Sequence, residues 1–207
     1  MPDSKVPEVL TGALQFGIKP GLERISELMR LLDNPQDRFK SIHIAGTNGK
    51  GSVATFISSI MAAGDKKVGV FTSPYLERFS ERIRIIDGKA GLEKYASDDS
   101  YGEIDGESLS RYSDKVKEAK EKMVAAGLTD EPTEFELITA ICFLYFADRN
   151  IDVAVLEVGL GGRLDSTNVI KDPMVTVITA LGLDHTGVLG NRLEREARGL
   201  VWKRNTP

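Results

Sequence analysis

Hydrophobic side chains along this chain switch repeatedly between helical and strand spacing. Apolar residues recur every three or four positions, as in helices with one buried face, over residues 21–32, 53–61, 109–123 and 133–146. Short β-branched or apolar runs stand between them at 41–45, 67–71, 82–86, 152–158 and 174–180. Runs without polar alternation are typical of strands covered on both faces. The pattern therefore predicts one α/β domain with a doubly wound, mostly parallel sheet.

Three segments carry more detailed expectations. The predicted inner face of the helix after the first strand comprises Val53, Ile57, Ile60 and Met61. Thr133 and Glu136 have the spacing of a capping box, which predicts a helix start there. Between residues 87 and 105 the chain is polar and contains several glycines, so we expect an exposed, mobile insertion with little bearing on chemistry.

Composition narrows the possible partners. The 207 residues include 27 Lys+Arg and 31 Asp+Glu, a formal net charge of −4. Without a basic block, the chain lacks the electrostatic footprint of a protein that binds nucleic acid or anionic membranes. The single cysteine, Cys142, excludes an internal disulfide, and we expect an inert core thiol in a cytoplasmic protein. Only two histidines are present, and His43, inside the first predicted strand, is expected to be a satisfied structural residue.

A glycine-rich segment, Gly46-Thr-Asn-Gly-Lys-Gly-Ser52, lies between the first predicted strand and the next helix. This is the order that a phosphate cradle requires, because Gly46 and Gly49 let backbone N–H groups converge on phosphate oxygens. Lys50 adds a positive charge, and Ser52 is placed to reach a magnesium ion. The spacing is shorter than that of the general P-loop pattern, which leaves a glycine-rich structural turn as the alternative.

The carboxyl ends of parallel strands meet along one edge of a sheet, where ligands bind. The segments expected at that edge are the glycine loop, Thr72-Ser73-Pro74, Glu157 with the loop 159–163, and Asp184-His185. An acidic residue at the end of an apolar strand is the position that holds magnesium in phosphoryl-transfer sites, and Glu157 occupies it. Taken singly, Glu157 is equally well explained as a surface carboxylate at a strand end, and His185 as a loop histidine hydrogen-bonded to backbone. Their common edge favours a functional role for both.

Four segments, in the same order along the chain, carry a specific resemblance: 45–52, 72–76, 156–168 and 182–186. Together they resemble the folylpolyglutamate synthase / dihydrofolate synthase family of the Mur ligase superfamily. The resemblance implies a P-loop NTPase-like ATPase domain that uses ATP and Mg²⁺. It implies a ligase in which ATP phosphorylates a folate or dihydropteroate carboxylate and the amine of L-glutamate attacks the acyl phosphate. A monomer without nucleic-acid or membrane partners is expected.

The resemblance also implies roles for individual residues. The ATP-binding positions are Thr47, Asn48, Gly49, Lys50, Gly51 and Ser52. The magnesium ligands are Ser73, Glu157 and His185, and the catalytic set is Lys50, Glu157 and His185. The substrate-binding positions are Thr72, Thr133, Phe135, Asp165 and Ser166, with the Phe135 ring available to stack on the pterin.

The sequence also departs from the family. Tyr75 and Glu134 stand where many members have His and an aromatic residue. The family's carbamylated lysine has no counterpart in the segment 196–199, and Lys203 matches only in another register. Family members are about twice as long, so residues 1–207 are expected to form an incomplete N-terminal ATP-binding domain without the C-terminal Rossmann-like glutamate-ligase domain. The activity of such a chain is open.

Two alternatives to the folate ligase stay open. One is another Mur-type amide ligase or a general P-loop ATPase, although no Asn-Lys pair is present for a guanine-specific N-K-x-D element. The other is a non-catalytic remnant that binds folate or nucleotide.

Overall fold

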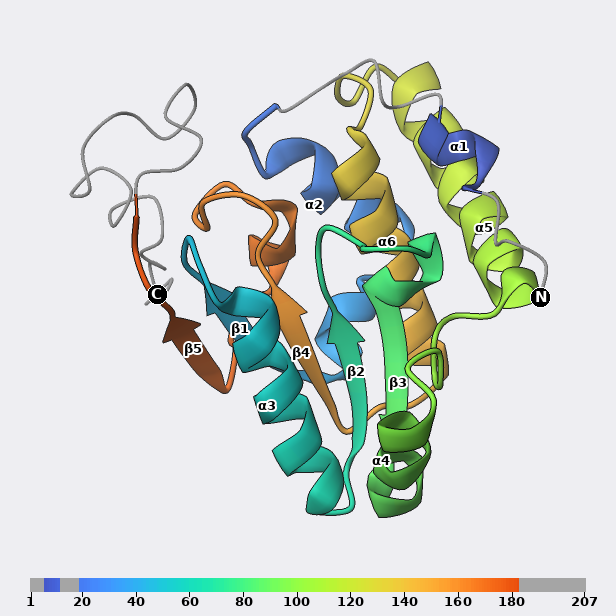
Figure 1. Cartoon of the computed structure of the whole chain (residues 1–207). Helices are drawn as coiled ribbons and strands as arrows, with labels where there is room; N and C mark the ends of the chain where they lie inside the picture. The colour runs from blue at the N-terminus through green and yellow to red at the C-terminus, as the bar shows by residue number, and fades with distance from the viewer. Residues whose placement is uncertain (1–5, 12–18, 183–207) are drawn as a thin grey trace.

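The computed structural model describes residues 6–11 and 19–182, and its centre is a five-stranded sheet (Figure 1). The strands are β1 (Lys40–Ala45), β2 (Lys67–Phe71), β3 (Ile83–Asp87), β4 (Val153–Glu157) and β5 (Val175–Ile178). Their order across the sheet is β3-β2-β4-β1-β5. Strands β2, β4, β1 and β5 are parallel, and only the edge strand β3 pairs antiparallel. The predicted mostly parallel sheet is confirmed.

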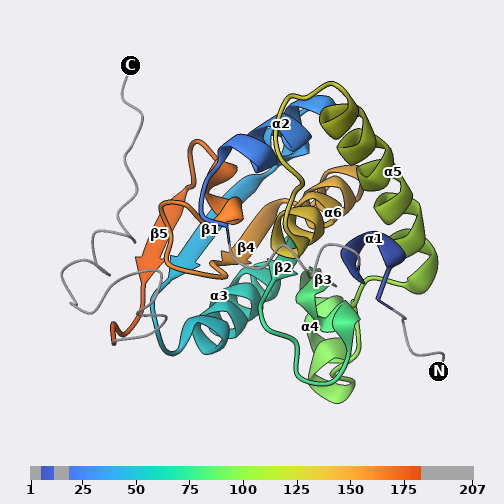
Figure 2. The ribbon, with the colours of Figure 1, turned by 90° about the horizontal axis from the view of Figure 1, so that it is seen from above.

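Helices cover both faces of this sheet, as the view from above shows (Figure 2). One face carries α3 (Lys50–Ala63) and α4 (Gly88–Ser97), and the other carries α2 (Glu23–Leu31), α5 (Gly106–Ala125) and α6 (Glu134–Asp148). The short helix α1 (Glu8–Thr11) contacts α5 and α6. Single 3₁₀ turns lie at Pro35–Arg38, Phe79–Arg82 and Ser166–Val169. The two helical layers give the predicted doubly wound architecture.

Helix α6 is the central element of the larger core. The capping box starts it as predicted: Thr133 Oγ1 accepts from the Glu136 N–H at 3.3 Å, and the Glu136 carboxylate accepts from the Thr133 N–H at 2.7 Å. Every residue from Glu136 to Ala147 is buried, including Cys142. The helix is apolar on all sides because the sheet and the helices α2 and α5 surround it. It fixes Phe135, in its first turn, at the carboxyl end of the sheet.

Two expectations about burial are wrong. Ile60 is 69% exposed, because the buried side of α3 is centred on Ala54, Ser58 and Ala62. The other residues of the predicted inner face, Val53, Ile57 and Met61, are partly buried beside it. The last strand is not covered on both faces within the described part of the chain. Val175 and Ile178 there are 49% and 50% exposed, because β5 ends the described sheet and pairs only with β1.

The expectation of an exposed insertion over residues 87–105 is confirmed only in part, because about half of its residues are exposed and the rest are packed against the protein. Helix α4 occupies most of this segment, and Ile104 behind it is buried in the main core. Glu103 forms an isolated antiparallel bridge with Arg84 of β3. The segment therefore folds back onto the sheet and contacts the loop between β2 and β3.

No helix in the described ranges combines the length and the apolar character needed to cross a bilayer.

Candidate functional site

The glycine loop follows β1 directly and opens α3 at the carboxyl edge of the sheet. Gly46 has φ 137°, and a Cβ there would lie 2.1 Å from Thr179 Oγ1, so only glycine fits against the end of β5. Gly49 is left-handed, with φ 83°, and forms the N-cap of α3. The two glycines thus turn the chain sharply from strand to helix, as a phosphate loop requires.

The first half of this loop is fastened to the segment after β5. The N–H groups of Thr47 and Asn48 both donate to the Ala180 carbonyl, at 2.9 and 3.2 Å. Thr47 Oγ1 also donates to the Gly182 carbonyl at 2.9 Å and accepts from the Gly182 N–H at 3.0 Å. Thr47 and Asn48 therefore anchor the loop. The N–H groups that helix geometry leaves without intrahelical acceptors are those of residues 50–52, in the first turn of α3.

Lys50 lies across its own loop. Its Nζ donates to the Gly46 carbonyl at 2.9 Å and to the Thr47 carbonyl at 3.2 Å. An ammonium group has three donors, so one remains for an incoming anion. The loop thus presents a fixed positive charge beside the N–H groups of α3.

Glu157 ends β4 next to this loop, as expected. The residue is 5% exposed, and its Oε2 accepts from the Ser73 N–H at 3.2 Å. A Cβ on Gly51 would lie 3.7 Å from the same oxygen. Burial raises the pKa of Glu157, while the Ser73 N–H and the charge of Lys50 act in the opposite direction. The sheet thus brings Lys50, Gly51, Ser73 and Glu157 together.

A buried carboxylate beside a serine hydroxyl and a phosphate-type loop is chemically suited to Mg²⁺, which prefers oxygen ligands and keeps several waters. Within residues 6–11 and 19–182, no group of three or more His, Cys, Asp and Glu side chains is placed to hold a metal ion. A magnesium ion here would therefore depend on Glu157, Ser73, water and substrate phosphate. His185, the third expected ligand, lies outside the described residues.

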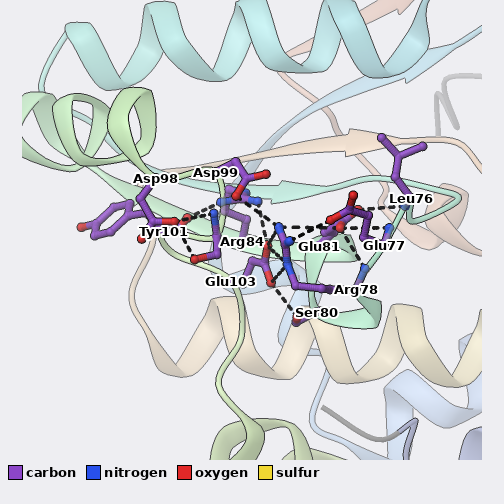
Figure 3. Close-up of polar contacts among 11 residues, drawn as sticks. Leu76, Glu77, Arg78, Ser80, Glu81, Arg84, Asp98, Asp99, Tyr101 and Glu103 are labelled. Atoms are coloured by element: carbon purple, nitrogen blue, oxygen red, sulfur yellow. Dashed lines mark hydrogen bonds and ion pairs between the residues drawn. The ribbon is translucent and has the colours of Figure 1, made fainter. Parts of the chain in front are cut away.

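The loop that carries Ser73 is held by a carboxylate (Figure 3). Glu81 accepts three consecutive backbone N–H groups, those of Leu76 at 2.8 Å, Glu77 at 3.1 Å and Arg78 at 2.8 Å. Three N–H donors to one ionised acceptor fix the loop backbone. The exposed side chain of Leu76 is therefore presented from a well-anchored backbone.

A second carboxylate, Glu103, joins this loop to the segment beyond α4 (Figure 3). It accepts from Ser80 Oγ at 2.6 Å, Arg78 Nη2 at 3.0 Å and Arg84 Nη2 at 3.3 Å. The side chain of Glu103 is 8% exposed, and that of Arg84 is 9% exposed. The polar segment 87–105 thus supplies a buried support for the Ser73 loop, which sequence reasoning missed.

Phe135 and Thr72 lie at the same edge as Glu157. The Phe135 ring is half-buried, with its centroid 5.8 Å from that of Phe71 at the end of β2. A Cβ on Gly159 would lie 2.4 Å from Phe135 Cζ, so the ring packs directly on the glycine backbone. Thr72 is half-buried and donates its N–H to the Arg82 carbonyl at 3.1 Å.

The other three expected substrate residues are buried and bonded within the protein. Thr133 Oγ1 donates to Glu136 Oε2 at 2.9 Å, and Ser166 Oγ lies 3.1 Å from Thr139 Oγ1. Asp165 is 5% exposed, and burial raises its pKa, against the hydrogen bonds that its carboxylate accepts. Thr133, Asp165 and Ser166 therefore build the walls behind Phe135, and a direct contact with a ligand stays a prediction.

Comparison with known proteins identifies the relatives of this site. No protein-family model matches the chain. The dihydrofolate synthase/folylpolyglutamate synthase of Bacillus subtilis is 42% identical over 189 residues, 90% of this chain and 40% of that protein. The dihydrofolate synthetase of Saccharomyces cerevisiae is 39% identical over 191 residues, with the same coverage of 90% and 40%. A solved FPGS complex with AMPPCP and folate has a TM-score of 0.76 at 36% identity, covering 92% of this chain and 45% of that one.

Over about 90% of its length, the chain is similar to folylpolyglutamate and dihydrofolate synthases. It spans about two fifths of the length of the curated relatives it matches. The Mur-ligase-type α/β fold expected from the sequence is therefore confirmed.

Two further residues border the edge of the sheet on which Phe135 lies. Arg24 Nε donates to Glu136 Oε2 at 3.1 Å, with the two side chains 11% and 4% exposed. Gly21, just before α2, donates its N–H to the Leu164 carbonyl at 3.5 Å. Glu136 Oε1 is buried and has no hydrogen-bond partner within the described part of the chain. The capping-box spacing revealed Glu136, but Arg24 is 112 residues away and no local pattern connects the two.

Proposed function

We propose that this chain forms the nucleotide-phosphate and folate side of an ATP-dependent ligase. The ligase adds L-glutamate to folate, to dihydropteroate, or to both. The observation that carries the proposal is the single sheet edge where Lys50, Ser73 and Glu157 lie beside the half-buried Phe135 ring. In this reaction, ATP phosphorylates the substrate carboxylate; the amine of L-glutamate then attacks the acyl carbon and phosphate leaves, which forms the amide.

The phosphate side is assigned to the glycine loop. Lys50 and the N–H groups of Gly51 and Ser52 bind the phosphates and stabilise the negative charge on the transferred group. Thr47 and Asn48 keep the loop in place through the segment after β5. Gly49 provides the left-handed turn.

The proposed metal ligands are Ser73, Glu157 and His185. A bound Mg²⁺ supplies charge neutralisation between the phosphates. The buried Glu157 carboxylate supports this assignment, because burial raises its pKa and a nearby cation favours its ionised form.

The folate side is assigned to the surface around Phe135. The ring stacks on the pterin, Thr72 borders it from the end of β2, and Thr133, Asp165 and Ser166 shape the wall. The remaining proposed properties are a cytoplasmic, monomeric protein that binds small molecules and no nucleic acid. The buried single thiol Cys142 and the net charge of −4 support them.

Calorimetric titration with Mg-AMPPCP and with pteroate tests the two sides separately. Lys50→Ala should weaken Mg-AMPPCP binding at least tenfold, since it removes a charged donor to phosphate, and leave pteroate affinity unchanged. Lys89→Ala is the matched control, because Lys89 is an exposed lysine at the start of α4. Equal nucleotide affinity in Lys50→Ala and wild type contradicts the phosphate-loop assignment.

An activity assay separates the alternatives. ATP- and glutamate-dependent lengthening of a folate by this chain supports the ligase in full. Turnover of another carboxylate substrate without folate turnover favours a different Mur-type ligase. Binding of both ligands without any turnover favours the non-catalytic remnant that binds folate or nucleotide.

A further inference from the structure

A buried chain of hydrogen bonds connects β1 with the loop that follows β4. His43 Nε2 lies 2.7 Å from Thr167 Oγ1, and this hydroxyl donates to Asp165 Oδ1 at 2.5 Å. His43 and Thr167 are fully buried, and Asp165 is 5% exposed. Bulk water does not reach such groups, so the protein itself sets how the three side chains are paired.

Counting protons gives the donor and the acceptor of each hydrogen bond in this series. A threonine hydroxyl carries one hydrogen, and Thr167 gives it to the Asp165 carboxylate. Thr167 Oγ1 can therefore only accept in its contact with His43, so Nε2 of His43 carries the proton. Burial lowers the pKa of His43 to about 3, which keeps the ring neutral. Hydrogen bonds then run in one direction, from His43 through Thr167 to Asp165.

Asp165 in turn organises the loop around it. Its Oδ2 accepts from the Leu160 N–H at 2.8 Å, and its Oδ1 accepts from the Thr167 N–H at 3.0 Å. The carboxylate thus ties together both ends of the loop 160–167. Gly159, next to Leu160, is the backbone on which the Phe135 ring packs. The orientation of Asp165 therefore determines the surface behind the ring.

His43 is placed for this role by strand alternation. Its neighbours Ile42 and Ile44 face the core under α3, so His43 projects to the opposite face of the sheet, where α6 and the Asp165 loop lie. Although it precedes the phosphate loop by only three residues, it contacts the folate side. A sequence separation of 124 residues divides His43 from Thr167.

We propose that His43 and Thr167 are positioning residues of the candidate folate side, fixing the Asp165 carboxylate and thereby the loop behind Phe135. The inference rests on the proposed function and deepens it, because it gives a role to two residues that need not touch either substrate. The inference separates the two sides of the site. Loss of the hydrogen bonds from His43 through Thr167 to Asp165 should impair pteroate binding and leave nucleotide binding unchanged.

Thr167→Val tests this directly, since it removes the hydroxyl and keeps the shape. Pteroate affinity should fall about tenfold, as expected for loss of a hydrogen bond to a buried carboxylate, while Mg-AMPPCP affinity stays within about twofold. Thr167→Ser restores the hydroxyl and should restore pteroate affinity. His43→Gln, which keeps an N–H donor at a similar reach, should bind pteroate better than His43→Leu.

A spectroscopic measurement on the unaltered chain supports or overturns the inference even if the valine variant fails to fold. Nitrogen-15 NMR should find His43 neutral with its proton on Nε2, and an Nδ1–H ring overturns the proposed direction. Equal pteroate affinity in wild type and Thr167→Val overturns the positioning role, as does an equal loss of Mg-AMPPCP affinity. If wild type itself binds no pteroate, the proposed function fails. The tautomer of His43 still shows whether the buried hydrogen bonds run in the proposed direction.

Discussion

Removal of the Glu103 carboxylate tests how firmly the Ser73 loop is supported. In Glu103→Ala, the Arg84 guanidinium loses its carboxylate partner at 3.3 Å while its side chain stays only 9% exposed. It keeps the Tyr101 carbonyl and its position 4.6 Å from the Tyr95 ring centroid, but neither supplies a negative charge. The substitution therefore leaves a buried, uncompensated cation.

The expected cost follows from the exposure of each partner. Breaking a buried ion pair from one side costs about 3–5 kcal/mol. Loss of the 2.6 Å bond from Ser80 adds about 1 kcal/mol. Arg78 is 31% exposed and keeps Glu81 and Asp99 within 4 Å, so solvent screens its pair with Glu103 and this pair is left out of the sum. The sum is roughly 4–6 kcal/mol of unfolding free energy, a large part of the usual 5–15 kcal/mol.

Urea unfolding followed by circular dichroism measures this difference. In a thermal unfolding experiment, the melting temperature should fall by roughly 8–24 °C, since about 1 kcal/mol shifts a chain of this size by about 2–4 °C. Asp99→Ala is the matched control, because Asp99 is 85% exposed and its loss should cost under about 0.5 kcal/mol. A Glu103→Ala protein within 1 kcal/mol of wild type refutes the reasoning, since Arg84 would then be rehydrated without penalty.

Three further predictions concern other parts of the chain. Burial lowers the pKa of His43 from 6.5 to about 3. As the pH falls through this range, the unfolded chain therefore binds a proton at His43 that the folded chain does not bind. Stability should therefore fall by up to about 1.4 kcal/mol per pH unit between 6.5 and 3, and urea titrations of His43→Gln should lack that contribution. Gly159→Ala places a Cβ 2.4 Å from Phe135 Cζ; calorimetry should find pteroate affinity roughly threefold to tenfold lower, and unchanged affinity argues against stacking on this ring. Cys142 is fully buried with a raised pKa, so a thiol reagent should label it only as fast as the chain unfolds; rapid native labelling contradicts the packing.

Local spacing explains what the sequence could predict. Thr133 and Glu136 are three residues apart, so their reciprocal bonds leave a visible pattern. The parallel strands are short apolar runs, and their shared carboxyl edge places Lys50, Ser73 and Glu157 together without any knowledge of distances. The sequence therefore allowed two kinds of feature to be predicted: those that lie within one segment, and those that follow from the common direction of parallel strands.

Contacts between distant polar residues were not accessible. Glu103 contacts Arg78 and Arg84 across a helix that the polar composition of residues 87–105 concealed. Nothing in the local sequence of His43 indicates Thr167 as its partner. Ile60 followed the apolar spacing of α3 but points outward, because periodicity alone does not give the width of a buried face.

The attachment of the glycine loop to the segment after β5 sets an order of events during synthesis. Thr47 bonds to Gly182 across 135 residues, and the Thr47 and Asn48 N–H groups also need Ala180 as their acceptor. At about 5–20 residues per second, a ribosome takes roughly 7–27 s to make the intervening chain. Until then the loop contains its glycines and lysine but lacks the hydrogen bonds to Ala180 and Gly182. The nucleotide loop is thus a late product of folding, completed only after most of the sheet can already have formed.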